Sequence, residues 1–138
     1  PATLATIFAR HGYQDYADIL LRLPAESVSG FLTGFMDRLV YHKGRWGVID
    51  WKTNDLGADA SLYSEAALHH HIRHHHYLLQ SVLYLVALRR FIGPSAPLVG
   101  AWVVYLRGIS ANTSQGILHV HPPEALLSEL SGCFSVSC

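Results

Sequence analysis

Two short segments carry residues that could together hold a divalent metal ion beside a phosphate. Asp37 ends the segment Gly34-Phe35-Met36-Asp37, and Asp50-Trp51-Lys52 follows thirteen positions later at the end of an apolar run. Carboxylate oxygens are preferred ligands of Mg²⁺, which commonly completes its shell with water and substrate phosphate. A lysine beside such an ion can orient an attacking water or stabilise developing negative charge. The same residues could instead be ordinary strand-end charges, because a D-x-K triplet is short and common.

An extended pattern around a glycine-containing turn predicts that these segments form a β-hairpin. Its expected strands cover residues 31–41 and 46–52. A turn centred between positions 43 and 44 places Asp37 opposite Asp50. Because side chains alternate along a strand, Asp50 and Lys52 share one side and Trp51 points to the other. Two carboxylates in these positions repel each other, whereas a metal ion bound to both would make their closeness favourable.

The remainder of the chain mixes helical and extended patterns, which indicates an α/β fold. Two short helices are expected before the hairpin, and one long helix, a strand buried on both faces, an edge strand and a short final helix are expected after it. Their expected ranges are 4–10, 16–23, 61–92, 98–106, 115–121 and from 122 onward, with Asp15 capping the second helix. No repeat or linker interrupts this order, so a single domain over residues 1–138 is the simplest prediction.

Composition excludes several classes of protein. The chain has 138 residues, half of them apolar, which is enough to bury a core. A net charge of zero with 14% charged residues argues against a wholesale electrostatic nucleic-acid binder, so DNA binding must come from local charge. Arg89 and Arg90 end the longest apolar run well short of a membrane span. Cys133 and Cys138 have no ligand-pair spacing, and the start is not signal-like, which favours a reducing, cytoplasmic setting.

Three motifs in order resemble those of RecB-type nucleases of the PD-(D/E)xK superfamily, the exodeoxyribonuclease V type. They are the G-x-x-D, D-x-K and Q-x-x-x-Y motifs, found here at Gly34–Asp37, Asp50–Lys52 and Gln80–Tyr84 within a similar stretch of about 30–118. The resemblance implies a restriction-endonuclease-like core with a central mixed sheet flanked by helices. It also implies Mg²⁺-dependent hydrolysis of DNA phosphodiester bonds, with Mn²⁺ as an alternative metal, in double-strand break repair and DNA degradation. The implied partners are DNA, helicase motor domains of the same polypeptide, and RecC-like and RecD-like subunits in a bacterial cytoplasm.

The resemblance also implies roles for individual residues. Asp37 and Asp50 would bind the metal together with the backbone carbonyl of Trp51, and Lys52 would be the catalytic lysine.

The helix that follows would complete this site. Gln80 and Tyr84 lie four residues apart and so share one helix face, from which they would line the site and contact DNA or order the motif strands. His75 falls where the family has a histidine in the helix that approaches DNA. Taken without the other motifs, Tyr84 could merely pack on the sheet and Gln80 could fill a polar gap.

One part of the family pattern has no match in this sequence. RecB-type nucleases carry a histidine in an early helix and an acidic residue on a preceding strand, and both help to hold metal. The histidine position is not matched by His11. The acidic position is not matched by Asp15, Asp18 or Glu26. We therefore expect the chain to begin after those motifs and after the first elements of the fold, with about half of a metal site. The sheet edge so exposed could be covered by the two amino-terminal helices or by another chain.

The absent motifs keep a second class of function open. A site with two carboxylates and one lysine could bind Mg²⁺ weakly and cut slowly, or not at all. The chain would then be a non-catalytic module that keeps the nuclease fold and docks DNA or a partner subunit.

Six of the ten histidines lie between positions 69 and 76. Three uses stay open: a pH-sensitive surface that faces DNA, a solvated helix face, and a site for Zn²⁺, Ni²⁺ or Cu²⁺. His70 and His74, or His71 and His75, have the four-residue spacing that such a metal site needs. Protonation below about pH 6.5 would add positive charge to this segment.

Three tryptophans occupy expected strand positions: Trp46, Trp51 and Trp102. Packing in the core or on the sheet is favoured over base stacking for them.

Overall fold

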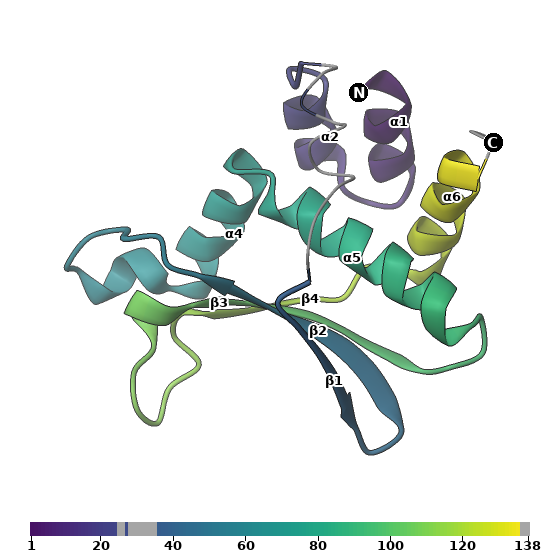
Figure 1. Cartoon of the computed structure of the whole chain (residues 1–138). Coiled ribbons are helices and arrows are strands. Elements are labelled where there is room, and N and C mark those ends of the chain that lie inside the picture. The colour runs from purple at the N-terminus through teal and green to yellow at the C-terminus, as the bar shows by residue number, and fades with distance from the viewer. Residues whose placement is uncertain (25–26, 28–35, 136–138) are drawn as a thin grey trace.

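A computed structural model describes residues 1–24, 27 and 36–135 of the chain. These residues form three layers: a four-stranded sheet, two helices across one face of the sheet, and three helices beyond those two (Figure 1). The strands are β1 (Arg38–His42), β2 (Arg45–Lys52), β3 (Leu98–Tyr105) and β4 (Ile117–Val120). The helices are α1 (Ala2–Arg10), α2 (Gln14–Leu20), α4 (Glu65–His74), α5 (Tyr77–Ile92) and α6 (Glu124–Ser135), with short 3-10 turns η1 (Ala60–Tyr63) and η2 (Leu106–Gly108).

The sheet is mixed, and its order is β1-β2-β3-β4. The β1–β2 hairpin and the β3–β4 pair are antiparallel, whereas β2 and β3 are parallel and are joined through α4 and α5. The predicted α/β class and mixed central sheet are therefore confirmed. The buried strand, the edge strand and the final helix also form close to the predicted ranges.

The hairpin has the predicted register. Arg38 pairs with Ile49, and one further step along the ladder brings Asp37 beside Asp50. The first strand of the hairpin begins at Arg38, later than predicted. The earlier part of that predicted strand, together with Gly34 and Phe35 of the G-x-x-D motif, lies outside the described residues.

The core lies mainly on both sides of α5. This helix is apolar almost all round, as a helix buried between two layers should be, and it has the sheet on one side and α1, α2 and α6 beyond it (Figure 1). The residues that fill this core and are fully shielded from solvent include Phe8, Tyr16, Leu20, Val48, Leu79, Val82, Ala101, Val103, Tyr105, Leu126 and Leu130. Within the described part, no helix is long and apolar enough to cross a membrane.

Trp51 is the most exposed of the three tryptophans that are predicted to pack in the core or on the sheet. Its side chain is 40% exposed, because strand alternation turns it to the sheet face opposite α5. Trp102 is half-buried and stacks on His119 with ring centroids 5.0 Å apart. Trp46 is also half-buried, against Tyr41.

The predicted single helix over 61–92 is wrong. The structure has η1, α4 and α5 instead, with α4 and α5 separated at His75 and His76. His76 has φ of 56°, a left-handed conformation that ends helical hydrogen bonding and costs a non-glycine residue roughly 1–2 kcal/mol. The His76 ring lies 3.2 Å, Nδ1 to hydroxyl, from Tyr16 of α2. This tertiary contact supports a break that no glycine or proline in the sequence signals.

The amino-terminal helices differ from the prediction in two respects. Tyr13 occupies the N-cap position of α2 without a side-chain cap, and Asp15 lies inside the first turn, where its charge still favours the helix dipole. The helices also do not cover the β1 edge, because Leu39 and Tyr41 remain exposed there. Instead, α1 packs against α6 and α2 packs against α4.

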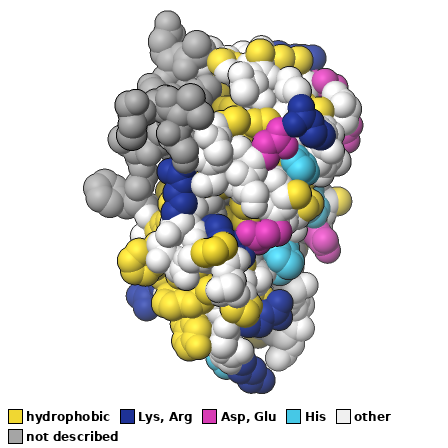
Figure 2. All heavy atoms as spheres, turned by 90° about the vertical axis from the view of Figure 1, so that its right-hand side faces the viewer, with side chains coloured by type: hydrophobic (Ala, Val, Ile, Leu, Met, Phe, Trp, Pro, Cys, Tyr) yellow, Lys and Arg dark blue, Asp and Glu magenta, His cyan; other side chains and the backbone are white. Residues whose placement is uncertain are grey.

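A charged contact joins α1 to α6. The His11 ring lies 2.7 Å from a carboxylate oxygen of Glu129, and Arg10 donates to the other oxygen. On the face of the molecule that carries α6, basic and acidic side chains are intermingled rather than segregated by sign (Figure 2).

We expect Glu129→Gln to lower the melting temperature at pH 7 and to lower it less as the pH falls toward 3. The hydrogen bond from His11, with Arg10 adding to it, lowers the pKa of Glu129 below its ordinary value of 4.5. A carboxyl group whose pKa is lower in the folded state stabilises the fold at pH values above its ordinary pKa. This stabilisation is lost as the pH falls through the folded-state pKa. Thermal unfolding at both pH values measures it, with Asp18→Asn, an exposed acid of α2, as control. An equal effect of Glu129→Gln at both pH values would contradict the assignment.

Candidate functional site

Asp50 is the one buried charged residue in the described part of the chain. It is 4% exposed and lies on the side of β2 that faces α5. Its Oδ2 is 2.9 Å from Nζ of Lys52 but receives no well-aligned hydrogen bond from the described residues. Burial raises the pKa of Asp50, the contact with Lys52 lowers it, and the hydrogen bond and charge of Asp37 raise it again. A buried carboxylate oxygen with spare acceptor capacity, next to a second carboxylate, fits a divalent cation.

Asp37 lies at the same end of the hairpin. Its side chain is exposed, and its Oδ2 accepts a hydrogen bond from the backbone N–H of Trp51 at 2.8 Å. That bond ties the start of β1 to the end of β2 and keeps the two carboxylates together. No group of three or more histidine, cysteine or acidic side chains among the described residues has a metal-binding arrangement. The role of the Trp51 carbonyl as a ligand stays a prediction.

Lys52 is enclosed by three partners. Its side chain is 10% exposed, and its Nζ lies 2.9 Å from Asp50 and donates a 2.7 Å hydrogen bond to Oε1 of Gln80. The same ammonium group lies 3.8 Å from the ring centroid of Tyr77, within the range of a cation–π contact. The lysine is therefore held between the strand and the first turn of α5.

Gln80 and Tyr84 lie on one face of α5, as their spacing predicts. Tyr84 is 7% exposed. Burial raises the pKa of its hydroxyl, the charges of Asp50 and Asp37 raise it further, and a hydrogen bond with the Gln80 side chain lowers it. Tyr84 thus lies in the electrostatic field of both carboxylates, and Gln80 links it to Lys52.

His75 lies farther from the carboxylates. It is exposed and stacks on His71 at 4.1 Å and on Tyr77 at 5.9 Å between ring centroids. Through Tyr77, His75 is linked to Lys52. A contact between His75 and DNA stays a prediction.

Sequence reasoning missed Tyr77 as a member of the site. Besides its contact with Lys52, its hydroxyl exchanges hydrogen bonds of 3.2 and 3.3 Å with Asn54, which follows the D-x-K strand. The signal was present: Tyr77 precedes Gln80 by three positions, so the two share a helix face. It was obscured because Tyr77 was expected in mid-helix, whereas it begins α5 after the left-handed His76.

Tyr105 was also missed, and its partner His71 was considered only as a possible metal ligand with His75. Tyr105 is fully buried, pairs in register with Lys52 and has its hydroxyl 2.7 Å from Nδ1 of His71. Burial raises the pKa of Tyr105, and the charges of Tyr77 and Asp50 raise it further, so it stays a neutral phenol.

The histidine segment does not form one surface. Burial, with nearby histidines adding to it, lowers the pKa of His71 and His76, so these two resist the protonation predicted for the segment. His70 and His74 are exposed on α4 and stack with centroids 3.9 Å apart. A solvated face, a DNA-facing surface and a two-histidine metal site all stay compatible with this pair.

On the nuclease function that the sequence resemblance implies, we expect Tyr77→Leu to lower the rate of metal-dependent DNA cleavage by about tenfold and Tyr77→Phe to lower it much less. Leucine removes the ring face that holds the Lys52 ammonium, whereas phenylalanine removes only the hydroxyl bonded to Asn54. Steady-state cleavage of linear DNA measures both variants. Equal losses would mean that the hydroxyl, and not the ring, positions the lysine.

A mixed sheet that brings two carboxylates together at one strand end, with a lysine two positions after the second, is the arrangement of a PD-(D/E)xK nuclease. The sequence matches the PD-(D/E)XK nuclease superfamily over residues 4–128, and the chain belongs to this superfamily. It is similar to the RecBCD enzyme subunit RecB of Haemophilus influenzae (29% identity over 119 residues, 81% of this chain), of Escherichia coli K12 (32% over 116 residues, 78%) and of Mycobacterium tuberculosis (33% over 133 residues, 84%). The matches cover only 10–12% of these relatives' length, so the chain resembles one part of RecB.

Proposed function

We propose that this chain cuts DNA phosphodiester bonds with the help of Mg²⁺, or Mn²⁺ in its place, as the nuclease domain of a RecBCD-type helicase–nuclease. The observation that carries the proposal is the buried Asp50–Lys52 pair, with Asp37 beside it and Gln80 holding the lysine. Because the chain is similar to a subunit of bacterial RecBCD enzymes, we also propose a place in double-strand break repair and DNA degradation in the cytoplasm. On the same grounds we propose helicase motor domains and RecC-like and RecD-like subunits as partners.

The residues divide the chemistry among them. Asp37 and Asp50 would hold the metal ion, which when bound polarises a phosphate oxygen and favours ionisation of water. Lys52, whose position is set by Gln80 and Tyr77, would orient the attacking water or stabilise the charge that develops on the phosphate. Burial of Asp50 and Lys52 strengthens these electrostatic effects, because little water screens them.

A non-catalytic docking module is the second candidate. The observation that favours it is that the described residues supply only two carboxylates to the site, and no cluster of three or more metal-binding side chains. Such a module would bind DNA or a partner subunit without metal, and Asp50→Ala would leave that binding unchanged.

The test uses the native polypeptide that contains these 138 residues, with linear duplex and single-stranded DNA in Mg²⁺, Mn²⁺ or EDTA. The nuclease proposal expects cleavage in both metals, none in EDTA, and none by Asp50→Ala. Metal-independent DNA binding that survives Asp50→Ala, without cleavage in any condition, would support the docking module and reject the nuclease.

A further inference from the structure

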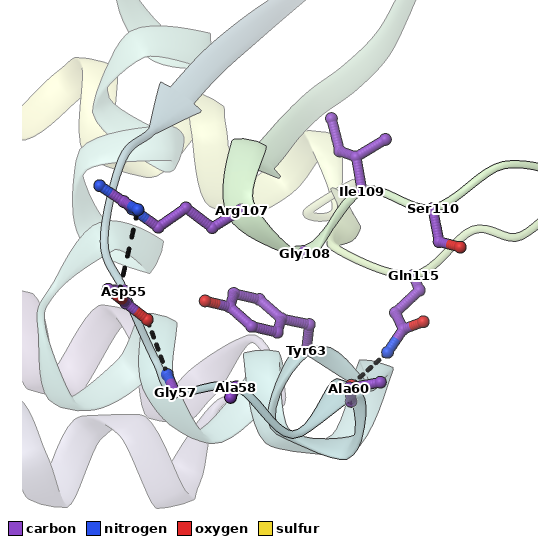
Figure 3. Close-up of a pocket in the computed structure, with 10 residues that line it drawn as sticks. All are labelled: Asp55, Gly57, Ala58, Ala60, Tyr63, Arg107, Gly108, Ile109, Ser110 and Gln115. Atoms are coloured by element: carbon purple, nitrogen blue, oxygen red, sulfur yellow. Dashed lines mark hydrogen bonds and ion pairs between the residues drawn. The ribbon is translucent and has the colours of Figure 1, made fainter.

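A cavity of about 430 Å³ opens at the sheet edge where β2 and β3 end (Figure 3). One side is formed by the loop after β2 and by Tyr63 of η1, and the other by η2 and the loop that follows it. Because β2 and β3 are parallel, their carboxyl ends share one edge, and this is the edge at which open α/β sheets commonly bind ligands. Lys52 is the last residue of β2, and the lining of the cavity begins three positions later in the chain, at Asp55.

Arg107 is the cationic group of this cavity. Its Nε donates a 3.0 Å hydrogen bond to the backbone carbonyl of Thr53, the residue directly after Lys52. Its Nη1 lies 4.0 Å from Oδ2 of Asp55, and both side chains are more than half exposed. An ion pair this long and this exposed contributes little, so the guanidinium can exchange it for a ligand. The planar guanidinium fork matches the oxygens of a phosphate.

The remaining walls are held in place before any ligand arrives. The hydroxyl of buried Tyr63 accepts a 2.9 Å hydrogen bond from Leu56 N–H, and its carbonyl accepts one from Gly116 N–H at 3.1 Å. Gln115 donates from its side chain to the carbonyl of Ala60 across the cavity (Figure 3). Gly108 packs so closely on the Tyr63 ring that no side chain fits between them. Because these contacts already order the walls, little conformational entropy is lost when a ligand binds.

We propose that this cavity is a subsite for one nucleotide of the DNA strand that is cut at Asp37, Asp50 and Lys52. The inference rests on the proposed function and adds to it a place that binds the strand beside the cleaved phosphate. The phosphate of that nucleotide contacts Arg107. Asp55, beside Arg107, can accept hydrogen bonds from donors on the sugar or base of the same nucleotide. The volume is within the range of pockets that hold small organic ligands.

Two measurements on the native polypeptide that contains these 138 residues, and on its variants, test the subsite. The first is binding of a fluorescent single-stranded oligonucleotide in EDTA over a series of salt concentrations. Arg107→Gln is expected to weaken binding by about tenfold and to reduce the salt slope by roughly 0.7, the amount due to one lost phosphate contact on a single strand. Arg107→Lys should keep the salt slope while losing part of the affinity. Arg45→Gln, at the exposed hairpin turn, is the matched control and should change both values less.

The second measurement is Mg²⁺-dependent cleavage of the oligonucleotide and of thymidine 5′-p-nitrophenyl phosphate, which is too short to fill both sites. Arg107→Gln is expected to raise KM for the oligonucleotide about tenfold and to raise KM for the short substrate less. If Arg107→Gln bound and cleaved DNA as well as the wild type does, the subsite would be overturned. If the wild type binds DNA without cutting it and Arg107→Gln weakens that binding, the subsite is supported and the nuclease proposal fails. If the wild type does not bind DNA, the subsite is overturned.

Discussion

Asp50→Asn and Lys52→Ala should each lower the rate of Mg²⁺-dependent DNA cleavage by about a hundredfold or more, which is the usual effect of removing a group that acts on the transition state. Asparagine keeps the size of Asp50 but removes the charge that would hold the metal. Alanine at position 52 removes the ammonium group that contacts both Asp50 and Gln80. Initial rates on linear DNA, with the metal concentration varied, measure both effects. For Asp50→Asn, extra Mg²⁺ should restore little activity, because the ligand itself is missing.

Matched controls separate chemistry from folding. Lys43→Ala removes the chain's other lysine, at the hairpin turn, and Asp18→Asn removes an exposed acid from α2. Both should cleave DNA at wild-type rates. The assignment of the site would be rejected if Asp50→Asn and Lys52→Ala were folded and as active as these controls, or if all four variants lost activity together.

Gly108→Ala should destabilise the fold by about 3 kcal/mol, the upper part of the range for overpacking a well-packed site. A Cβ at this position would lie 2.3 Å from an atom of the Tyr63 ring, which is buried and cannot move aside cheaply. The backbone of Gly116 packs against Gly108 from another side, so the loop has little freedom to shift. Urea unfolding of the variant and the wild type measures the difference in the free energy of unfolding.

Gly132→Ala is the matched control for this substitution. Gly132 lies within α6, and a Cβ there would meet no atom within 4 Å. Alanine is expected to stabilise the helix by roughly 0.5–1 kcal/mol relative to glycine. A Gly108→Ala protein as stable as the wild type would show that Tyr63 and η2 do not pack as described, and the cavity built on them would lose its support.

Local patterns predicted the hairpin half of the site. The turn between Lys43 and Gly44 determines the pairing of the two strands, and that register alone brings Asp37 beside Asp50. Strand alternation then separates Trp51 from its neighbours and turns it to the exposed face. These features depend on residues close together in the chain, so they could be derived without knowledge of the tertiary structure.

The helical half of the site depends on tertiary contacts and was predicted less well. The break at His76 follows from a contact with Tyr16, sixty positions away, and no turn residue marks it in the sequence. That break makes Tyr77 the first residue of α5 and places its ring over Lys52. The positions of Gln80 and Tyr84 were predicted because helix spacing alone puts them on one face.

The order in which the site assembles during folding depends on which of its contacts are local and which are long-range. The hairpin that joins Asp37 to Trp51 closes a short loop, and hairpins form within microseconds. The parallel pairing of β2 with β3 must wait until the long segment through α4 and α5 has crossed the sheet, and such non-local pairing is slow. We therefore expect the carboxylates to meet early in folding, and Lys52 to meet Gln80 and Tyr77 only in the last, cooperative step.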